Sequence, residues 1–239
     1  MRKMPLGQLS AEFVVIVVGV LVALAVDQWR ESVGARAAEA QYVSRLIDDL
    51  TIDSLQSERF IEAGAAKAAA LAEVMDALDD SAAVRLRPST AWPDMNFTYT
   101  RPPPQTTTFD ELRNTGGLGL IRSDDLRFEI GNTYRLLQHH YERLEDRRTR
   151  IAFTVAELFP SASWGLGTTP DLSSAQIDSA FYATPDSGAR LQRLMSAEYR
   201  GLLNQERIYA RSMEAISRQM LDLTVGLLEG LRAYQSTLR

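Results

Sequence analysis

The chain of 239 residues contains no cysteine, which excludes disulfides, thiolate zinc sites and cysteine nucleophiles and leaves the redox compartment open. Histidine occurs only twice, at His139 and His140. Adjacent helical residues point about 100° apart, so the two imidazoles do not face one ion. The formal net charge of −5 also argues against a nucleic-acid partner, because phosphate recognition needs a basic face.

Signatures of catalysis and of cofactor binding are lacking as well. Gly116-Gly117 and the Gly-Leu-Gly at 165–167 are not followed by the Lys-Ser/Thr of a phosphate-binding loop, and no G-x-S-x-G serine elbow occurs. His139 and Glu142 share one helix face, but the remaining ligands of a metal would have to come from another helix. We interpret this cluster as a solvated helix face and expect no enzymatic activity, no metal and no other cofactor.

One long apolar run is present near the N-terminus, where Phe13 to Val26 reads FVVIVVGVLVALAV. Extended to Leu9 and Trp29, the run reaches about 30 Å as a helix, close to the thickness of the hydrocarbon layer. The sequence therefore predicts a tail over 1–8, a transmembrane helix over 9–29 and an extramembrane domain over 30–239. A cleaved signal peptide and a buried core helix remain alternatives, since Ala23-Leu24-Ala25 fits a cleavage site and the uninterrupted run is short.

Charged and aromatic residues border this predicted span. Glu12 and Asp27 flank the apolar run, and Trp29 lies where an interfacial anchor is expected. The two acids are interpreted as interfacial carboxylates; the alternative is an acidic ring in an oligomeric pore. Basic residues are almost balanced across the span, and the free amino terminus favours a cytoplasmic N-terminus with the rest of the chain outside.

Helical patterns follow the span. A long helix is predicted over 35–83, where no proline occurs and small residues fill the middle of the apolar stripe. Such a pattern favours close approach of another helix; the alternative is a groove. The stripe expected to be buried is Val43, Ile47, Leu50, Ser54, Ser57, Ile61, Gly64, Ala68, Leu71, Met75 and Leu78. A proline-rich loop is predicted over 84–107, and its aromatic residues, Trp92 among them, are expected to dock on the bundle or to bind a partner.

A sharp turn between two helices is predicted next. Thr108 and Glu111 have the spacing of a capping box at the start of a short helix over 108–116, and Gly116-Gly117 supplies a left-handed turn at its end. Ser123 is the expected cap of a helix over 123–158. A loop with one short helix over 159–185 and a last helix over 186–235 complete the domain. The predicted fold class is all-α: a transmembrane helix followed by an elongated antiparallel three- to four-helix bundle.

Three segments resemble a family of bacterial single-pass membrane proteins that is defined only as a domain of unknown function. They read ALAVDQWRE, YVSRLIDDL and TFDELRNTGGLGLIRSDDLRFEIGNTY, and the similarity covers residues 8–60 and 106–145. The resemblance implies a bacterial source and a helical extramembrane domain, and it implies no activity, cofactor or catalytic residue. Location in the bacterial inner membrane, with the bulk of the chain periplasmic, follows as an expectation.

Three functions are consistent with this sequence. The first is a membrane-anchored helical scaffold or interaction module that contacts the bilayer and either self-associates or docks another membrane or extracytoplasmic protein. The second is an extracytoplasmic small-molecule sensor or accessory subunit. The third is an oligomeric pore that uses the acids at Glu12 or Asp27.

Overall fold

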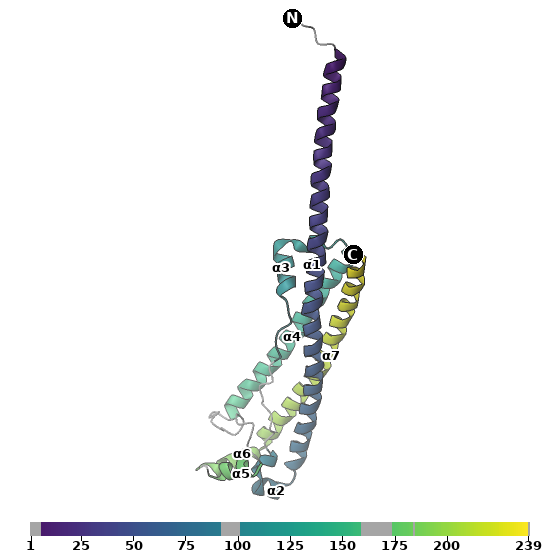
Figure 1. Ribbon diagram of the computed structural model, residues 1–239. Coiled ribbons are helices and arrows are strands. Elements are labelled where there is room, and N and C mark those ends of the chain that lie inside the picture. Colours follow the sequence, from purple (N-terminus) through teal and green to yellow (C-terminus); the bar gives the residue numbers. More distant parts are fainter. Residues whose placement is uncertain (1–5, 92–100, 159–173, 184, 239) are drawn as a thin grey trace.

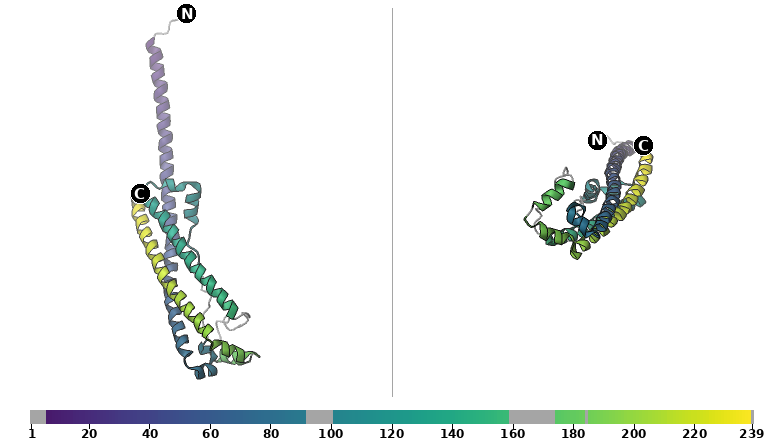
Figure 2. Two further views of the ribbon diagram at one scale, coloured as in Figure 1. Left: turned by 180° about the vertical axis from the view of Figure 1, so that it is seen from behind. Right: turned by 90° about the horizontal axis from the view of Figure 1, so that it is seen from below.

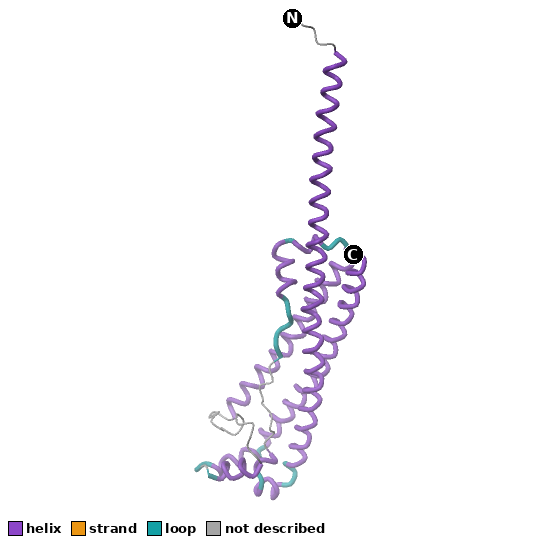
Figure 3. Tube along the Cα trace, in the orientation of Figure 1, coloured by secondary structure: helices purple, strands orange, loops and turns teal. Residues whose placement is uncertain are grey.

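The structure is a computed structural model that describes residues 6–91, 101–158, 174–183 and 185–238, with the side chains of the first helix from Ile16 onward. Every regular element of these residues is helical, which confirms the all-α prediction (Figures 1 and 3). The elements are α1 (Leu6–Ala77), α2 (Ser81–Leu86), η1 (Pro88–Ala91), α3 (Thr107–Thr115), η2 (Gly117–Leu120), α4 (Asp124–Leu158), α5 (Ser174–Tyr182), α6 (Ser187–Leu194) and α7 (Ala197–Thr237).

The first helix is continuous over 72 residues, from Leu6 to Ala77. The predicted span over 9–29 and the predicted helix over 35–83 are therefore parts of one rod, because no proline occurs between Pro5 and Pro88. The rod ends earlier than expected, since Asp80 accepts hydrogen bonds from the backbone N–H of Ala82 and Ala83 and starts α2. Within the described residues, no helix is both long enough and apolar enough to cross a membrane.

The C-terminal half of α1 packs against α7, which runs in the opposite direction (Figures 1 and 2). We call the α1 side of this contact the seam; its buried positions alternate in steps of three and four, as in a coiled coil. They are Val43, Leu46, Leu50, Asp53, Ser57, Gly64, Lys67, Leu71, Val74 and Leu78, with half-buried Phe60 completing the series. The predicted stripe was wrong at Ile47, Ser54, Ile61, Ala68 and Met75, which are only half-buried. The prediction missed Asp53 and Lys67, because a charged side chain on a helix is normally exposed to solvent.

The two helices approach most closely at Gly64. A Cβ atom on Gly64 would lie 2.8 Å from the carbonyl oxygen of Ala210 and 2.9 Å from the backbone nitrogen of Glu214, both on α7. Only glycine fits at this crossing. The predicted close packing at the small residues of 35–83 is therefore confirmed.

The third long helix, α4, packs on a second face of α7 and completes a bundle (Figure 2). Its buried residues include Leu126, Ile130, Leu137, Leu144 and Ile151. The helix expected over 186–235 is interrupted, because Ser196 accepts a hydrogen bond from Tyr199 N–H and starts α7 after the shorter α6. Short helices close the lower end, where Arg200 of α7 donates to Asp79 at 2.8 Å.

The predicted loop over 84–107 is partly helical. α2 extends to Leu86 and η1 covers Pro88–Ala91, while residues 101–106 are non-helical and lead into α3. Trp92 lies outside the described residues, as do 159–173 of the next predicted loop. The short helix expected in that second loop is present as α5.

Candidate functional site

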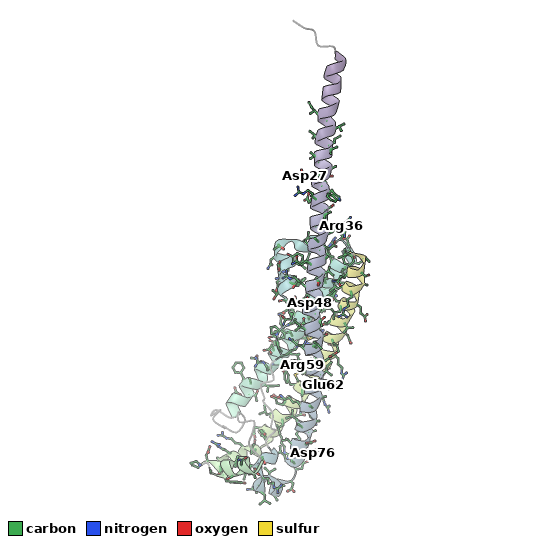
Figure 4. The ribbon with its side chains drawn as sticks, viewed as in Figure 1. Asp27, Arg36, Asp48, Arg59, Glu62 and Asp76 are labelled. Carbon is green, nitrogen blue, oxygen red and sulfur yellow. The ribbon has the colours of Figure 1, made fainter. Side chains whose placement is uncertain are left out.

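The N-terminal half of α1 extends beyond the bundle as a free helix (Figure 1). Asp27 and Trp29 lie on this free part and are exposed, Trp29 to 67% (Figure 4). The backbone of Glu12 belongs to α1, but its side chain lies outside the described residues. The structure thus places the predicted flanking residues on one exposed rod.

Apolar side chains of this rod are exposed on every face. We call residues 16–29 the apolar segment; its large exposed side chains are Ile16, Val17, Val18, Val20, Leu21, Val22, Leu24, Val26 and Trp29. Lower on the same helix, the labelled residues Asp48, Arg59, Glu62 and Asp76 are charged and exposed (Figure 4). One helix therefore changes from a surface that is apolar except at Asp27 and Gln28 to the polar outer surface of a water-soluble bundle.

The capping box predicted at Thr108 and Glu111 was wrong. The N-cap of α3 is Thr106, and Thr108 is buried within the first turn. Two carboxylates of α1 bind the free N–H groups instead: Asp53 accepts from Gln105 N–H at 3.0 and 3.1 Å, and Asp49 accepts from Thr108 N–H at 3.4 Å. The start of α3 is thus held by another helix rather than by its own sequence.

Glu111 binds α1 as well. It accepts from the hydroxyl of Tyr42 at 2.8 Å and forms an ion pair with Arg45 at 2.6 Å. These hydrogen bonds keep the pKa of Glu111 below its ordinary value. Its role is to attach α3 to α1.

The turn after α3 agrees with the sequence. Gly116 has φ 73°, the left-handed conformation that glycine adopts without strain, and Gly117 follows in η2. Ser123 accepts a hydrogen bond from Leu126 N–H and caps α4, with Asp124 and Asp125 in the first turn. The predictions at Gly116 and Ser123 are confirmed, whereas Gly117 does not adopt the left-handed conformation, which among the described residues Gly116 alone adopts.

Arg101 attaches the residues before α3 to both α1 and α7. It is 3% exposed, and its guanidinium donates to the hydroxyls of Ser57 on α1 at 2.9 Å and Ser217 on α7 at 3.0 Å. Its Cζ also lies 5.6 Å from the centre of the Phe60 ring. Burial lowers the pKa of Arg101, and the nearby Asp53 carboxylate partly offsets that effect. Arg101 joins three parts of the chain that are distant in sequence.

Asp53 is the acidic member of this cluster and is 1% exposed. Burial raises its pKa to about 6, against the opposing effects of the Gln105 N–H and Arg101. The charged groups around it are Asp49 on its own helix and Arg101, and the hydroxyl of Tyr134 on α4 feels the field of Asp49, Asp53 and Asp110. The cluster therefore contains a carboxyl group that is costly to ionise.

Asp53 should make stability fall with rising pH. Its folded-state pKa exceeds its unfolded one, so the stabilisation from its bound proton is present below about pH 4 and is lost as the pH rises through about 6. The loss amounts to about 3 kcal/mol, at about 1.4 kcal/mol for each pH unit between the two pKa values. We expect Asp53→Asn to remove this decline in urea unfolding curves of the full chain recorded between about pH 4 and pH 7.

Ser57→Ala is the matched control for that experiment. It removes one acceptor of the Arg101 guanidinium but no titratable group, so it should lower stability by a similar amount at every pH. Parallel pH profiles for the wild type and Asp53→Asn would contradict the assignment.

A second polar junction lies where α1 leaves the bundle. Glu39, which is 1% exposed, accepts from the backbone N–H and the Nε of Arg122, both at 2.9 Å, and from the hydroxyl of Tyr234 on α7. Burial alone would raise the pKa of Glu39, but these hydrogen bonds outweigh burial and lower it. The junction ties α1 to the end of α7 and to the segment before α4.

The third polar contact is an ion pair within the seam. Lys67 Nζ lies 2.6 Å from Glu206 Oε2, with the two side chains 1% and 0% exposed, and 5.5 Å from the centre of the Tyr209 ring. The other carboxylate oxygen of Glu206 has no hydrogen-bond donor among the described residues. Burial raises the pKa of Glu206, and the attraction of Lys67 partly offsets this.

Sequence reasoning missed Glu39, Asp53, Lys67, Arg101 and Glu206. One signal was available, because Asp53 and Lys67 follow Leu50 and Gly64 by three residues and so continue the apolar spacing. Glu206 has the same relation to Leu203 on α7. Residues of opposite charge at the buried positions of two helices indicate a buried ion pair. Arg101 lies outside any helix, so no helical spacing in the sequence could predict its burial.

A groove of about 770 Å³ separates α3 from α4. The α3 side is formed by Thr106, Phe109, Asp110 and Arg113, and the α4 side by Gly131, Tyr134, Arg135, Gln138, His139 and Glu142. Phe109 and Tyr134 stack in parallel, with ring centres 4.5 Å apart, and this stack joins the two walls. The volume is in the range of small-molecule sites.

No metal-binding grouping is found in the described part of the chain. Nowhere in that part do three or more His, Asp or Glu side chains lie together so that they could hold a metal ion. His139 lines the groove, whereas His140 is half-buried and burial lowers its pKa. The two adjacent histidines thus have different surroundings.

We compared the chain with models of protein families, with curated proteins and with solved structures, and it matches none of them. The resemblance to bacterial single-pass membrane proteins therefore stays a prediction from the residues that suggest it.

Proposed function

We propose that this protein is a membrane-anchored helical module that carries no catalytic activity, with the N-terminal part of α1 as its anchor. The observation that supports the proposal is the apolar segment, whose side chains are exposed on all faces of a helix that extends beyond the bundle. An apolar surface of this extent is stable in lipid or against another protein, and costly in water. The predicted span begins at Leu9, ahead of the described side chains.

The connection between anchor and bundle supports a tethering role. α1 continues as one helix from the apolar segment into the seam, and the junction at Glu39 fixes it to α7 and to the chain before α4. A position in the bacterial inner membrane with the bundle outside the cytoplasm, and a second copy or another protein as partner, belong to the same proposal. An acidic pore at Glu12 or Asp27 has no further observation in its favour.

Membrane extraction of the full chain tests the anchor. We expect the wild type to stay in the membrane pellet after an alkaline carbonate wash and to dissolve in detergent. The double variant Val18→Arg/Leu21→Arg should leave the pellet, because each arginine at the centre of a span costs about 2.5–3.5 kcal/mol.

Ile52→Arg/Leu55→Arg is the matched control. It has the same spacing on the same helix and replaces apolar residues of similar exposure, 45% and 51% against 51% and 59%, but it lies on the outer face of the bundle. This control should remain in the pellet. Recovery of the intact wild type in the soluble fraction would refute the anchor.

A further inference from the structure

The groove between α3 and α4 has charges of both signs that are incompletely paired. Arg135 donates to Asn132 Oδ1 at 2.7 Å and has no carboxylate partner among the residues the structure describes. Glu142 accepts from Gln138 Nε2 at 2.9 Å and, within the same residues, forms no ion pair. The groove thus offers one guanidinium and one carboxylate to a ligand.

The separation of these two groups sets the length of that ligand. Arg135 and Glu142 are seven residues apart on one face of α4, which places their Cα atoms about 10 Å apart along the helix. An extended chain covers about 3.3–3.6 Å per residue, so three amino-acid residues span the same distance.

The groups between the two charges suit a peptide backbone. The Thr106 side chain makes no capping bond to its own helix, and the Gln138 amide lies on the opposite wall, so both walls carry groups able to bond peptide N–H or C=O. Phe109, half-buried, adds an apolar wall for a side chain. Next to these groups, a Cβ atom on Gly131 would meet nothing within 4 Å, which leaves room in the groove.

We propose that this groove binds short peptides with free termini, about three residues long, with the carboxylate on Arg135 and the ammonium group on Glu142. A single inorganic anion fits less well, because Asp110 and Glu142 would repel it. One wall of the groove, α3, is attached to the anchor helix α1, because Glu111 of α3 binds Arg45 and because Asp49 and Asp53 of α1 accept hydrogen bonds at the start of α3. A bound peptide would therefore contact α3, the helix that is attached to α1.

Calorimetric titration of the full-length protein in detergent with trialanine tests the proposal. Trialanine is expected to bind at millimolar concentration, and N-acetyltrialanine amide, which lacks both charges, is not. Arg135→Gln should weaken trialanine binding about tenfold or more, the size of a charge-assisted hydrogen bond, and leave the binding of trialanine amide unchanged. Glu142→Gln should weaken the binding of trialanine by a similar factor and leave the binding of N-acetyltrialanine unchanged.

Two further variants separate the groove from the rest of the surface. Gly131→Met fills the groove without altering its charge and should reduce binding, whereas Arg150→Gln, at an exposed arginine of α4 outside the groove, should not. Absence of trialanine binding, equal binding of the doubly capped peptide, or an unchanged affinity in Arg135→Gln would each overturn the site. None of these results depends on the membrane anchor, which the extraction experiment tests separately.

Discussion

Replacing Lys67 by methionine is expected to lower the free energy of unfolding of the full chain by about 3–5 kcal/mol. The substitution keeps most of the side-chain volume but leaves the Glu206 carboxylate, 0% exposed, without its cation. A buried charge that has lost its partner is one of the most costly defects in a protein interior. Urea unfolding in detergent, followed by circular dichroism, measures the loss.

The double variant Lys67→Met/Glu206→Leu distinguishes the ion pair from simple packing. Removing both charges should restore wild-type stability or exceed it by about 1–4 kcal/mol, because the desolvation cost of both ions disappears. Arg218→Met serves as a control at the exposed pair with Glu214 on α7, where a loss below about 1 kcal/mol is expected. A double variant no more stable than Lys67→Met alone would contradict this account of the seam.

Gly64→Ala is expected to lower the free energy of unfolding by about 1–3 kcal/mol. Its new methyl group would meet the backbone of α7 at 2.8 and 2.9 Å, and backbone atoms cannot rotate away as a flexible side chain can. The overlap outweighs the gain in helix propensity of about 1 kcal/mol that alanine has over glycine. The two helices would have to separate at their closest point.

The same substitution at Gly226 of α7 is the matched control. A Cβ atom on Gly226 meets nothing within 4 Å, and the residue is exposed, so Gly226→Ala should raise stability by up to about 1 kcal/mol. Opposite signs for the two substitutions are the expected result. If Gly64→Ala stabilised the chain as Gly226→Ala does, the close contact at Gly64 would be absent.

The variants Lys67→Met and Gly64→Ala also test whether the anchor works independently of the bundle's stability. Lys67 and Gly64 lie in the seam, far along α1 from the apolar segment, so variants at these positions should unfold more easily and still remain in the membrane pellet. Stability of the bundle and retention by the anchor are thus separable measurements. A tether that holds a folded module predicts this independence.

Local signals in the sequence anticipated much of the helical structure. Proline-free stretches, the Gly116-Gly117 turn and the Ser123 cap act on neighbouring residues, and each was found where it was expected. The same approach failed for Thr108, because the N–H groups at the start of α3 are bound by Asp49 and Asp53, more than fifty residues earlier in the chain. A capping box is only one of several ways to satisfy a helix N-terminus.

The sequence by itself determined that the chain is helical, where α4 begins, and that a long apolar run lies near the N-terminus, since propensity, capping and hydropathy are properties of short segments. Only the tertiary structure decided which charged residues are buried. Asp53, Lys67 and Arg101 look solvent-exposed in isolation. Lys67 and Arg101 are buried against Glu206 and Ser217 of α7, more than one hundred residues away. Asp53 is buried against the chain before α3, where it accepts a hydrogen bond from Gln105 N–H. A buried charge is stable only beside its partner, and folding alone brings the two together.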